Sequence, residues 1–323
     1  MHAEITSPGR RPKGGHLGDR IFGGITWLSA VAVLLVLGAI VAMLYLGARP
    51  ALEKFGFWNF LASAQWDPVE ELFGGLSPTV GTLVSSLIAI LIAVPVSFGI
   101  ALFITELAPP WLKRPVGTAI ELLAAIPSII YGMWGLFVFA PWFADNLQPL
   151  LTDTLGELPY VGELFQGPPL GISVFTAGIV LSIMIIPFIA SVMRDVFETV
   201  PTGLRESAFG LGSTTWEVVW NVVLPMTRVG VVGGIMLGLG RALGETMAVT
   251  FVIGNAHELH WGLFEPGNSI ASTIANEFTE ADGEIYTASL IALGLILFLI
   301  TFVVLALAKV MLVRMARQAG RRT

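Results

Sequence analysis

The sequence predicts an all-α polytopic membrane protein with six transmembrane helices and a helix-turn-helix on one side of the membrane. Of 323 residues, 55% are hydrophobic and only 12% are charged, whereas an ordinary soluble domain carries about 25% charged residues. The mean hydropathy is +0.81, and the apolar residues fall into long runs separated by clusters of charge. These observations exclude a soluble enzyme and indicate one membrane-spanning unit.

Six apolar runs are long enough for a helix to cross a bilayer, which takes about 20 residues. We place the spans at residues 21–47, 79–105, 116–140, 172–193, 229–254 and 286–313. The first run imitates a signal peptide, but it is too long and lacks a clear cleavage site, so we expect a retained anchor helix. The chain then divides into a tail (1–20), the anchor (21–47), an outer loop (48–78), a core (79–313) and a basic tail (314–323).

Three prolines, Pro95, Pro127 and Pro187, fall inside the predicted spans. Each removes a backbone donor and is expected to kink its helix unless neighbouring groups satisfy the freed carbonyl. Kinked helices suit a bundle that lines a path, but they are common in membrane helices of any function. The prolines alone therefore predict no activity.

The basic residues alternate between the two sides of the predicted spans. Most of the 17 lysines and arginines lie in the N-terminal tail, after the second span, between the fourth and fifth spans, or at the C-terminus. The opposite side holds only Arg49 and Lys54, and its loops are acidic. By the positive-inside rule, both termini are predicted to be cytoplasmic.

The chain contains no cysteine, which excludes a disulfide framework, a thiol nucleophile and any cysteine-based metal site. His257 and His260 lie three residues apart in an outer loop with Glu258 between them, but no further metal ligand is apparent. A membrane-embedded hydrolase would need a nucleophile or a metal set at one depth, and we find no such set of Ser, His and Asp. We therefore expect no metal, no cofactor and no catalytic residue.

The predicted fifth span combines a glycine stripe with two charged residues. Gly230, Gly234 and Gly238 recur every four residues, so one side of the helix is nearly bare backbone and another helix can pack closely there. Arg241 and Glu245 stand one turn apart on the same predicted helix. Placing an arginine in the hydrocarbon layer costs at least about 2.5 to 3.5 kcal/mol. Charged residues inside predicted spans are therefore functional candidates by default.

Two interpretations of this charged pair remain open. In one, Glu245 neutralises Arg241 as a structural ion pair. In the other, the guanidinium binds an anionic substrate, because it keeps its proton and matches tetrahedral oxyanions in a two-bond geometry. Arginine before glutamate is the weaker order for such a bridge, which favours the second interpretation. Arg241 and Glu245 are therefore our candidates for the substrate path.

The segment between the fourth and fifth spans, residues 199–225, is too polar to cross the membrane. It predicts two short helices around a turn at Gly210 and Gly212, with Ser213 beginning the second. Six of its residues match the E-A-A-x3-G-x9-I-x-L-P signature of binding-protein-dependent ABC importer permeases: Glu206, Ala208, Gly212, Val222, Leu224 and Pro225. The segment resembles the coupling element of type I ABC importer permeases, with Ser207 and Val222 as mild departures.

Within that group the chain resembles the PstC-type phosphate permeases. Three stretches carry the resemblance: IPSIIYG at 126–132, IMIIPFI at 183–189 and GRALGETMAV at 240–249. It implies a bacterial inner-membrane heterodimer with a PstA-like permease, two copies of a PstB-like ATPase inside and a PstS-like phosphate-binding protein outside. It also implies that the intramembrane Arg and Glu of the family fall on Arg241 and Glu245. Lipid surrounds the spans, and no nucleic-acid partner is expected.

The chain is not predicted to hydrolyse ATP itself. A Walker A loop needs glycine directly before its lysine, and no glycine precedes any of the four lysines, Lys13, Lys54, Lys113 and Lys309. The implied function is the permease subunit of an ATP-driven phosphate importer. The alternatives are a permease for another oxyanion, such as sulfate or molybdate, and a secondary anion transporter, which would have no use for a coupling segment.

Overall fold

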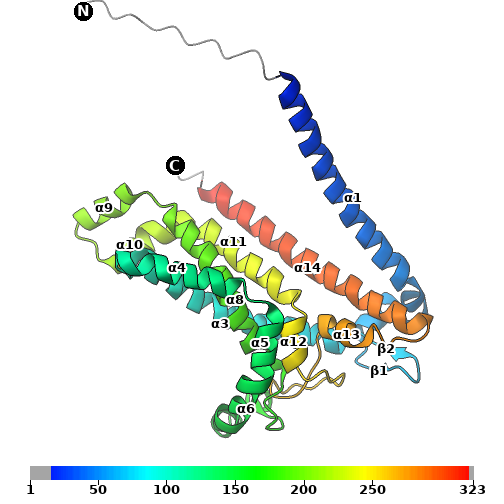
Figure 1. Ribbon diagram of the computed structural model, residues 1–323. Helices are drawn as coiled ribbons and strands as arrows, with labels where there is room; N and C mark the ends of the chain where they lie inside the picture. Colours follow the sequence, from blue (N-terminus) through cyan, green and yellow to red (C-terminus); the bar gives the residue numbers. More distant parts are fainter. Residues whose placement is uncertain (1–15, 320–323) are drawn as a thin grey trace, which may run out of the picture. The chain divides into compact units, whose positions relative to one another are not determined.

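The computed structural model describes residues 16–319, which are mostly helical (Figure 1). The chain divides into two compact units, residues 1–47 and 48–323, and helix α1 (His16–Phe55) runs through the boundary. In the described part of the first unit, α1 is apolar and largely exposed, as a helix in contact with lipid requires.

Both predicted tails are helical where they are described. Helix α1 begins at His16, before the predicted end of the N-terminal tail, and α14 (Glu284–Ala319) continues well beyond residue 313. Five of the basic residues that support the predicted orientation lie outside the described residues: Arg10, Arg11, Lys13, Arg321 and Arg322.

The second unit holds the remaining elements. After α2 (Phe57–Ala62), strand β1 (Trp66–Asp67) pairs antiparallel with β2 (Leu72–Phe73), with Trp66 opposite Phe73 and Asp67 opposite Leu72. The other helices are α3 (Leu76–Leu102), α4 (Pro110–Ala124), α5 (Ser128–Trp134), α6 (Ala140–Trp142), α7 (Gln148–Leu155), α8 (Val174–Glu198), α9 (Thr202–Gly210), α10 (Thr215–Val218), α11 (Leu224–Leu243), α12 (Met247–Val252) and α13 (Ile270–Glu277). Single π turns lie at Phe103–Leu107, Gly135–Phe139, Phe143–Leu147 and Val219–Val223, and a 3-10 turn lies at Gly162–Phe165.

Among the described residues, five helices are long and apolar enough to cross a membrane, or six if one bent pair counts as a single span. The bent pair is α4 with the helical stretch Ser128–Leu155, which meet at 88°. The predicted third span at 116–140 is therefore interrupted at Pro127, where the sequence predicts a kink, and it is divided between two helices. Pro127 explains the break, because proline lacks an N–H and disfavours helical backbone at the preceding residue. Pro95 and Pro187 lie inside α3 and α8, which continue through them.

The prediction of one continuous helix at 229–254 is wrong. Helix α11 is preceded without interruption by α10 and a π turn, and it ends at Leu243. The chain then turns through Gly244 and begins α12 at Met247. The second of the two predicted short helices is thus continuous with the fifth span. It begins at Thr215 and not at Ser213, because Thr214 and Glu217 form a capping box there.

The core of the second unit lies where α3 and α11 pack against α8. The glycine stripe of α11 faces α8, which confirms the predicted close approach. Cβ atoms added at Gly230, Gly234 and Gly238 would meet the side chains of Val196, Val192 and Ile189, respectively. In a bilayer, apolar side chains gain little by exchanging lipid for one another, so small residues that let two backbones approach hold helices together.

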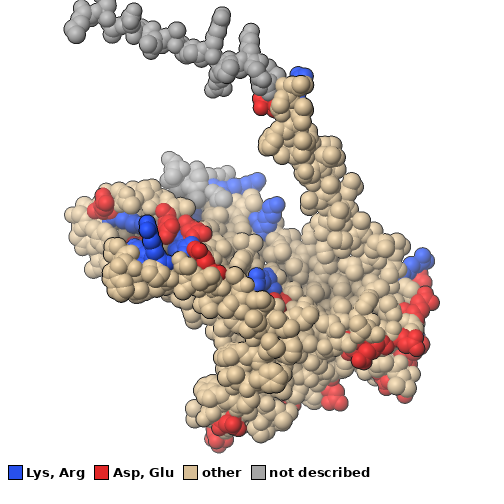
Figure 2. All heavy atoms as spheres, viewed as in Figure 1, with Lys and Arg blue, Asp and Glu red and all other residues tan. Residues whose placement is uncertain are grey.

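Charge is distributed as a protein that crosses a bilayer requires. On the face in Figure 2, charged side chains gather around α9 and α10, and again around the β1–β2 hairpin and α13. Few charged side chains lie on the surface between these two regions. That surface is suited to the hydrocarbon layer of a membrane.

Gly81 in α3 lets the loop before α13 touch the helix. A Cβ atom at this position would overlap the backbone carbonyl oxygen of Asn268. We expect Gly81→Ala to lower the free energy of unfolding by about 1 to 3 kcal/mol, because the loop backbone must move. Thermal unfolding of the purified protein in detergent measures the change.

The matched control is Gly99→Ala in the same helix, where a new methyl group meets no atom within 4 Å. Alanine favours helix over glycine by about 0.8 to 1 kcal/mol, so this variant is expected to be at least as stable as the wild type. Equal unfolding midpoints for the two variants would contradict the proposed role of Gly81.

Candidate functional site

Arg241 lies in the last turn of α11, at the end of a segment apolar enough to span a membrane. Its Cζ atom is 5.7 Å from the centroid of the Phe188 ring on α8, a cation–π contact. The side chain is exposed on this chain, and within residues 16–319 no salt bridge joins it to a carboxylate. The guanidinium donors are therefore available to a group outside the chain.

Glu245 does not neutralise Arg241. Helix α11 ends at Leu243, so the two residues are not one turn apart on a common helix, as the sequence predicted. The Glu245 side chain instead accepts a hydrogen bond from the backbone N–H of Ala248 at 3.3 Å, in the first turn of α12. This position, beside the start of a helix, is favourable for a carboxylate.

Two interrupted helices meet beside Arg241. Helix α5 follows the break at Pro127, α12 follows the break at Gly244, and the two helices pack against each other (Figure 1). Gly132 allows the contact, because a Cβ atom there would meet the backbone of Ala248. Non-helical backbone at membrane depth is tolerated where it is buried in protein or lines a water-filled cavity. The paired breaks therefore favour a path next to the arginine.

The structure brings together the three stretches that carry the family resemblance. Phe188, from 183–189, lies under the guanidinium of Arg241, from 240–249. Tyr131, from 126–132, is close enough to Arg241 for the charge of the guanidinium to act on the Tyr131 phenol. The Tyr131 hydroxyl donates a hydrogen bond to the Leu123 carbonyl oxygen at 2.9 Å. Sequence reasoning did not select Phe188 or Tyr131 individually, although both lie inside stretches that it had singled out.

The signature residues of the segment 199–225 differ in their environments. Glu206 in α9 is exposed, whereas Ala208 and Leu224 pack against the core of the second unit. Gly212 has a φ of 89°, a backbone conformation that glycine adopts without strain, so it makes the turn between α9 and α10. Pro225 lies inside the continuous helical segment Thr215–Leu243, just after the π turn Val219–Val223 that joins α10 to α11.

At the other end of the second unit, four side chains form a hydrogen-bonded cluster that the sequence did not predict. Glu277 at the end of α13 is bonded by Trp66 Nε1 at 2.8 Å, the Tyr286 hydroxyl at 2.8 Å and His257 Nε2 at 2.7 Å. The His257 ring stacks on Trp66, with centroids 5.3 Å apart. The cluster joins the β1–β2 hairpin, the loop before α13, α13 itself and α14.

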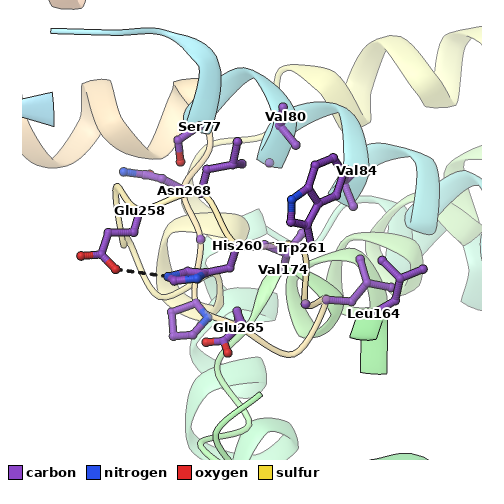
Figure 3. Close-up of a pocket in the computed structure, with 16 residues that line it drawn as sticks. Ser77, Val80, Val84, Leu164, Val174, Glu258, His260, Trp261, Glu265 and Asn268 are labelled. Carbon is purple, nitrogen blue, oxygen red and sulfur yellow. Dashed lines mark ion pairs between the residues drawn. The ribbon is translucent and has the colours of Figure 1, made fainter. Parts of the chain in front are cut away.

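His260 belongs to a different environment. Its Nε2 atom is 3.3 Å from a carboxylate oxygen of Glu258, at a cavity of about 200 Å³ between the start of α3 and the loop before α13 (Figure 3). Within residues 16–319, no group of three or more His, Asp or Glu side chains could hold a metal ion. His257 and His260 are therefore loop residues with different carboxylate partners.

Residues 93–317 match the family described as the binding-protein-dependent transport system inner membrane component. The chain is 59% identical to the phosphate transport system permease protein PstC of Pasteurella multocida, over 95% of each chain. It is 56% identical to the protein of the same description from Mesorhizobium japonicum, over 94% of this chain and 93% of the relative.

The fold is also similar to solved structures. A crystal structure of a bacterial ABC transporter involved in the import of the acidic polysaccharide alginate contains a chain with a TM-score of 0.57 and 20% identity. The similarity covers 91% of this chain and 99% of that one. At this identity the comparison concerns the fold alone, which is that of an ABC importer permease.

The Glu277 cluster predicts a pH-dependent contribution to stability. Burial alone would raise the pKa of Glu277, but the hydrogen bonds from His257, Tyr286 and Trp66 and the charge of His257 outweigh burial and lower this pKa below its ordinary value of 4.5. Because the folded-state pKa is lowered, the contribution is fully present above about pH 4.5 and is lost as the pH falls through the lowered value.

We therefore expect Glu277→Gln to lower the free energy of unfolding at pH 7 by about 1.5 to 3 kcal/mol, the range for a hydrogen bond to a charged group. The difference from the wild type should shrink below pH 4.5. Thermal unfolding across pH measures both effects, with Asp282→Asn, an exposed position nearby, as the control. A constant difference at all pH values would contradict the assignment.

Proposed function

The chain belongs to the family of binding-protein-dependent transport system inner membrane components, and on that premise we propose that it is the permease subunit of an ATP-driven importer of inorganic phosphate. Its relatives of 59% and 56% identity are described as phosphate transport system permease proteins. The single observation that carries the proposal is Arg241, an arginine at the end of a membrane span with no carboxylate partner among the described residues.

The chemistry of Arg241 supports an oxyanion as the transported substrate. A guanidinium remains protonated at physiological pH, and its fork donates two parallel hydrogen bonds to a tetrahedral oxyanion. The Phe188 ring supports one face of the guanidinium and does not consume its N–H donors. Glu245, beyond the end of α11, is the second proposed residue of the path. Its proposed role is to contact the substrate or to hold the first turn of α12.

The proposed partners follow from what the chain contains and what it leaves exposed. It has no Walker A loop, so the proposal assigns ATP hydrolysis to two copies of a PstB-like ATPase. We assign Glu206, Ala208, Gly212, Leu224 and Pro225 to the coupling segment that these copies contact. A PstA-like permease would complete the path, and a PstS-like protein would deliver phosphate from outside.

The proposed orientation places both termini in the cytoplasm. The basic residues at the end of α14, Arg314 and Arg317, lie at the same end of the second unit as α9 (Figure 1). This arrangement agrees with the positive-inside rule. In this orientation, the coupling segment faces the ATPase, and the Glu277 cluster faces the binding protein.

Arg241→Gln is expected to lower transport strongly without preventing assembly. The change removes the charge and the fork, and charge-assisted hydrogen bonds are worth about 1.5 to 3 kcal/mol each, so uptake should fall about tenfold or more. The measurement is uptake of radiolabelled phosphate by proteoliposomes that contain the chain and its three partners, with sulfate as competitor.

Arg241→Lys is the matched control, because it keeps the charge and loses the fork. It should retain an intermediate rate. Uptake that survives Arg241→Gln would reduce Arg241 to a structural residue. Preferential inhibition by sulfate would identify a different oxyanion as cargo, and ATP-independent uptake would indicate a secondary transporter.

Glu206→Lys is expected to uncouple the complex. The residue is exposed on α9, so the change should leave the fold intact but reverse the charge that meets the ATPase. We expect uptake to fall about five- to a hundredfold, the range of a typical coupling free energy, while ATP hydrolysis continues. Glu198→Lys, also exposed at the cytoplasmic end of α8, is the control. Normal transport by the Glu206 variant would refute the coupling role.

A further inference from the structure

Helix α9, the first helix of the proposed coupling segment, buries none of its residues. Because α9 has no buried residue, specific contacts are needed to transmit a displacement of α9 to the transmembrane helices. Its neighbouring residues Arg205 and Glu206 differ in environment. Glu206 is exposed, whereas the Arg205 side chain is only 17% exposed.

Arg205 reaches two elements that lie outside the coupling segment. Its Nη2 atom donates to the backbone carbonyl oxygen of Phe197 at 2.6 Å, in the last turn of α8. The same atom lies 3.2 Å from Oε1 of Glu106, an ion pair that does not have the geometry of a hydrogen bond. Glu106 belongs to the π turn Phe103–Leu107, which directly continues α3. One guanidinium therefore connects α9 to the cytoplasmic ends of α3 and α8.

The burial of this contact distinguishes it from the other arginine pairs at the same end. The side chain of Glu106 is only 7% exposed. Arg194, by contrast, pairs with Glu121 and Asp195, whose side chains are 56% and 65% exposed. An exposed pair is screened by water and contributes little, whereas a buried charge that loses its partner is strongly unfavourable. Removal of either side chain, Arg205 or Glu106, would thus leave the charge of the other without its partner.

The helical segment that carries Glu106 is held at the preceding residue, Thr105. Lys113 in α4 donates to the carbonyl oxygen of Thr105 at 2.6 Å, one residue before Glu106. The Thr105 hydroxyl donates back to the carbonyl oxygen of Ala101 at 3.0 Å, within the same helical segment. Phe197, on the other side of Arg205, is fully buried and makes an edge contact with Phe98 of α3. The two ends that Arg205 reaches are therefore packed against each other.

We infer that Arg205 is a positioning residue of the transport cycle, which joins the coupling helix α9 to α3 and α8 through Glu106 and the Phe197 carbonyl. A displacement of α9 by the ATPase then moves the cytoplasmic ends of both spans as one body. The inference rests on the proposed function and adds to it, because Glu206 would face the ATPase while Arg205 faces the permease core. It assigns a role to two residues outside the family signature.

The test is a double-mutant cycle in proteoliposomes that contain the chain and its three partners. Arg205→Gln and Glu106→Gln are each expected to lower the phosphate taken up per ATP hydrolysed about fivefold or more, because a loose α9 transmits less of its displacement. The double variant should lose no more than the worse single variant, since both changes break the same contact. Additive losses, or normal uptake per ATP in either single variant, would overturn the inference.

Arg114→Gln is the matched control. It removes an arginine from an exposed position on α4, at the same end of the second unit, and should leave uptake per ATP unchanged. Arg205→Lys keeps the charge, and partial recovery of uptake per ATP is expected, since a single ammonium cannot reproduce the planar guanidinium. A merely structural role for Arg205 would lower the amount of assembled complex and leave uptake per ATP in the remaining complex unchanged.

A distance measurement tests the same contact without reference to the cargo. The chain has no cysteine, so spin labels can be attached at Leu107→Cys and Leu211→Cys, two exposed positions at the end of the Phe103–Leu107 turn and just after α9. In the assembled complex, the distance between the labels should stay constant when ATP is added, and it should change in the Arg205→Gln background. An ATP-dependent change with Arg205 intact would refute a rigid connection. Absence of phosphate uptake by the wild type would instead refute the proposed function.

Discussion

The approach of α11 to α8 across Gly230, Gly234 and Gly238 is the contact on which the rest of the second unit depends. Lipid offers no hydrophobic gain for packing one apolar helix against another, so the two backbones must come close enough for dispersion contacts to hold them. Gly238 faces Ile189, and the next residue back on α8, Phe188, lies under the guanidinium of Arg241. Larger residues in the stripe would push the helices apart and separate Arg241 from its aromatic support.

The two helix breaks follow the same physical rule. A backbone polar group without a partner is costly in hydrocarbon, and irregular backbone is tolerated at membrane depth where it is buried in protein or lines a water-filled cavity. Helices α5 and α12, which follow the two breaks, pack against each other. The irregular backbone at these breaks lies beside Arg241, where its free polar groups could contact a polar ligand. At the opposite end of this helical segment, the capping box formed by Thr214 and Glu217 provides hydrogen-bond acceptors for free backbone N–H groups at the start of α10.

The candidate site was partly predictable from the sequence. Arg241 was identifiable because a charge inside an apolar run is expensive wherever its neighbours lie. Its relation to Glu245 was predicted wrongly, because a periodic pattern does not reveal that α11 ends at Leu243. Phe188 and the Glu106–Arg205 pair could not be found at all, since contacts between residues far apart in the chain leave no periodicity.

The sequence by itself determined the helical membrane architecture, the close-packing glycine face and the presence of an arginine inside an apolar run, because each depends on residue type and spacing within one segment. Only the tertiary structure decided where the third and fifth spans break and which side chain supports Arg241. It also decided that Arg205 is partly buried beside Glu106 while Glu206 remains exposed. These outcomes depend on which helices become neighbours, and neighbours are set by the packing of the whole bundle.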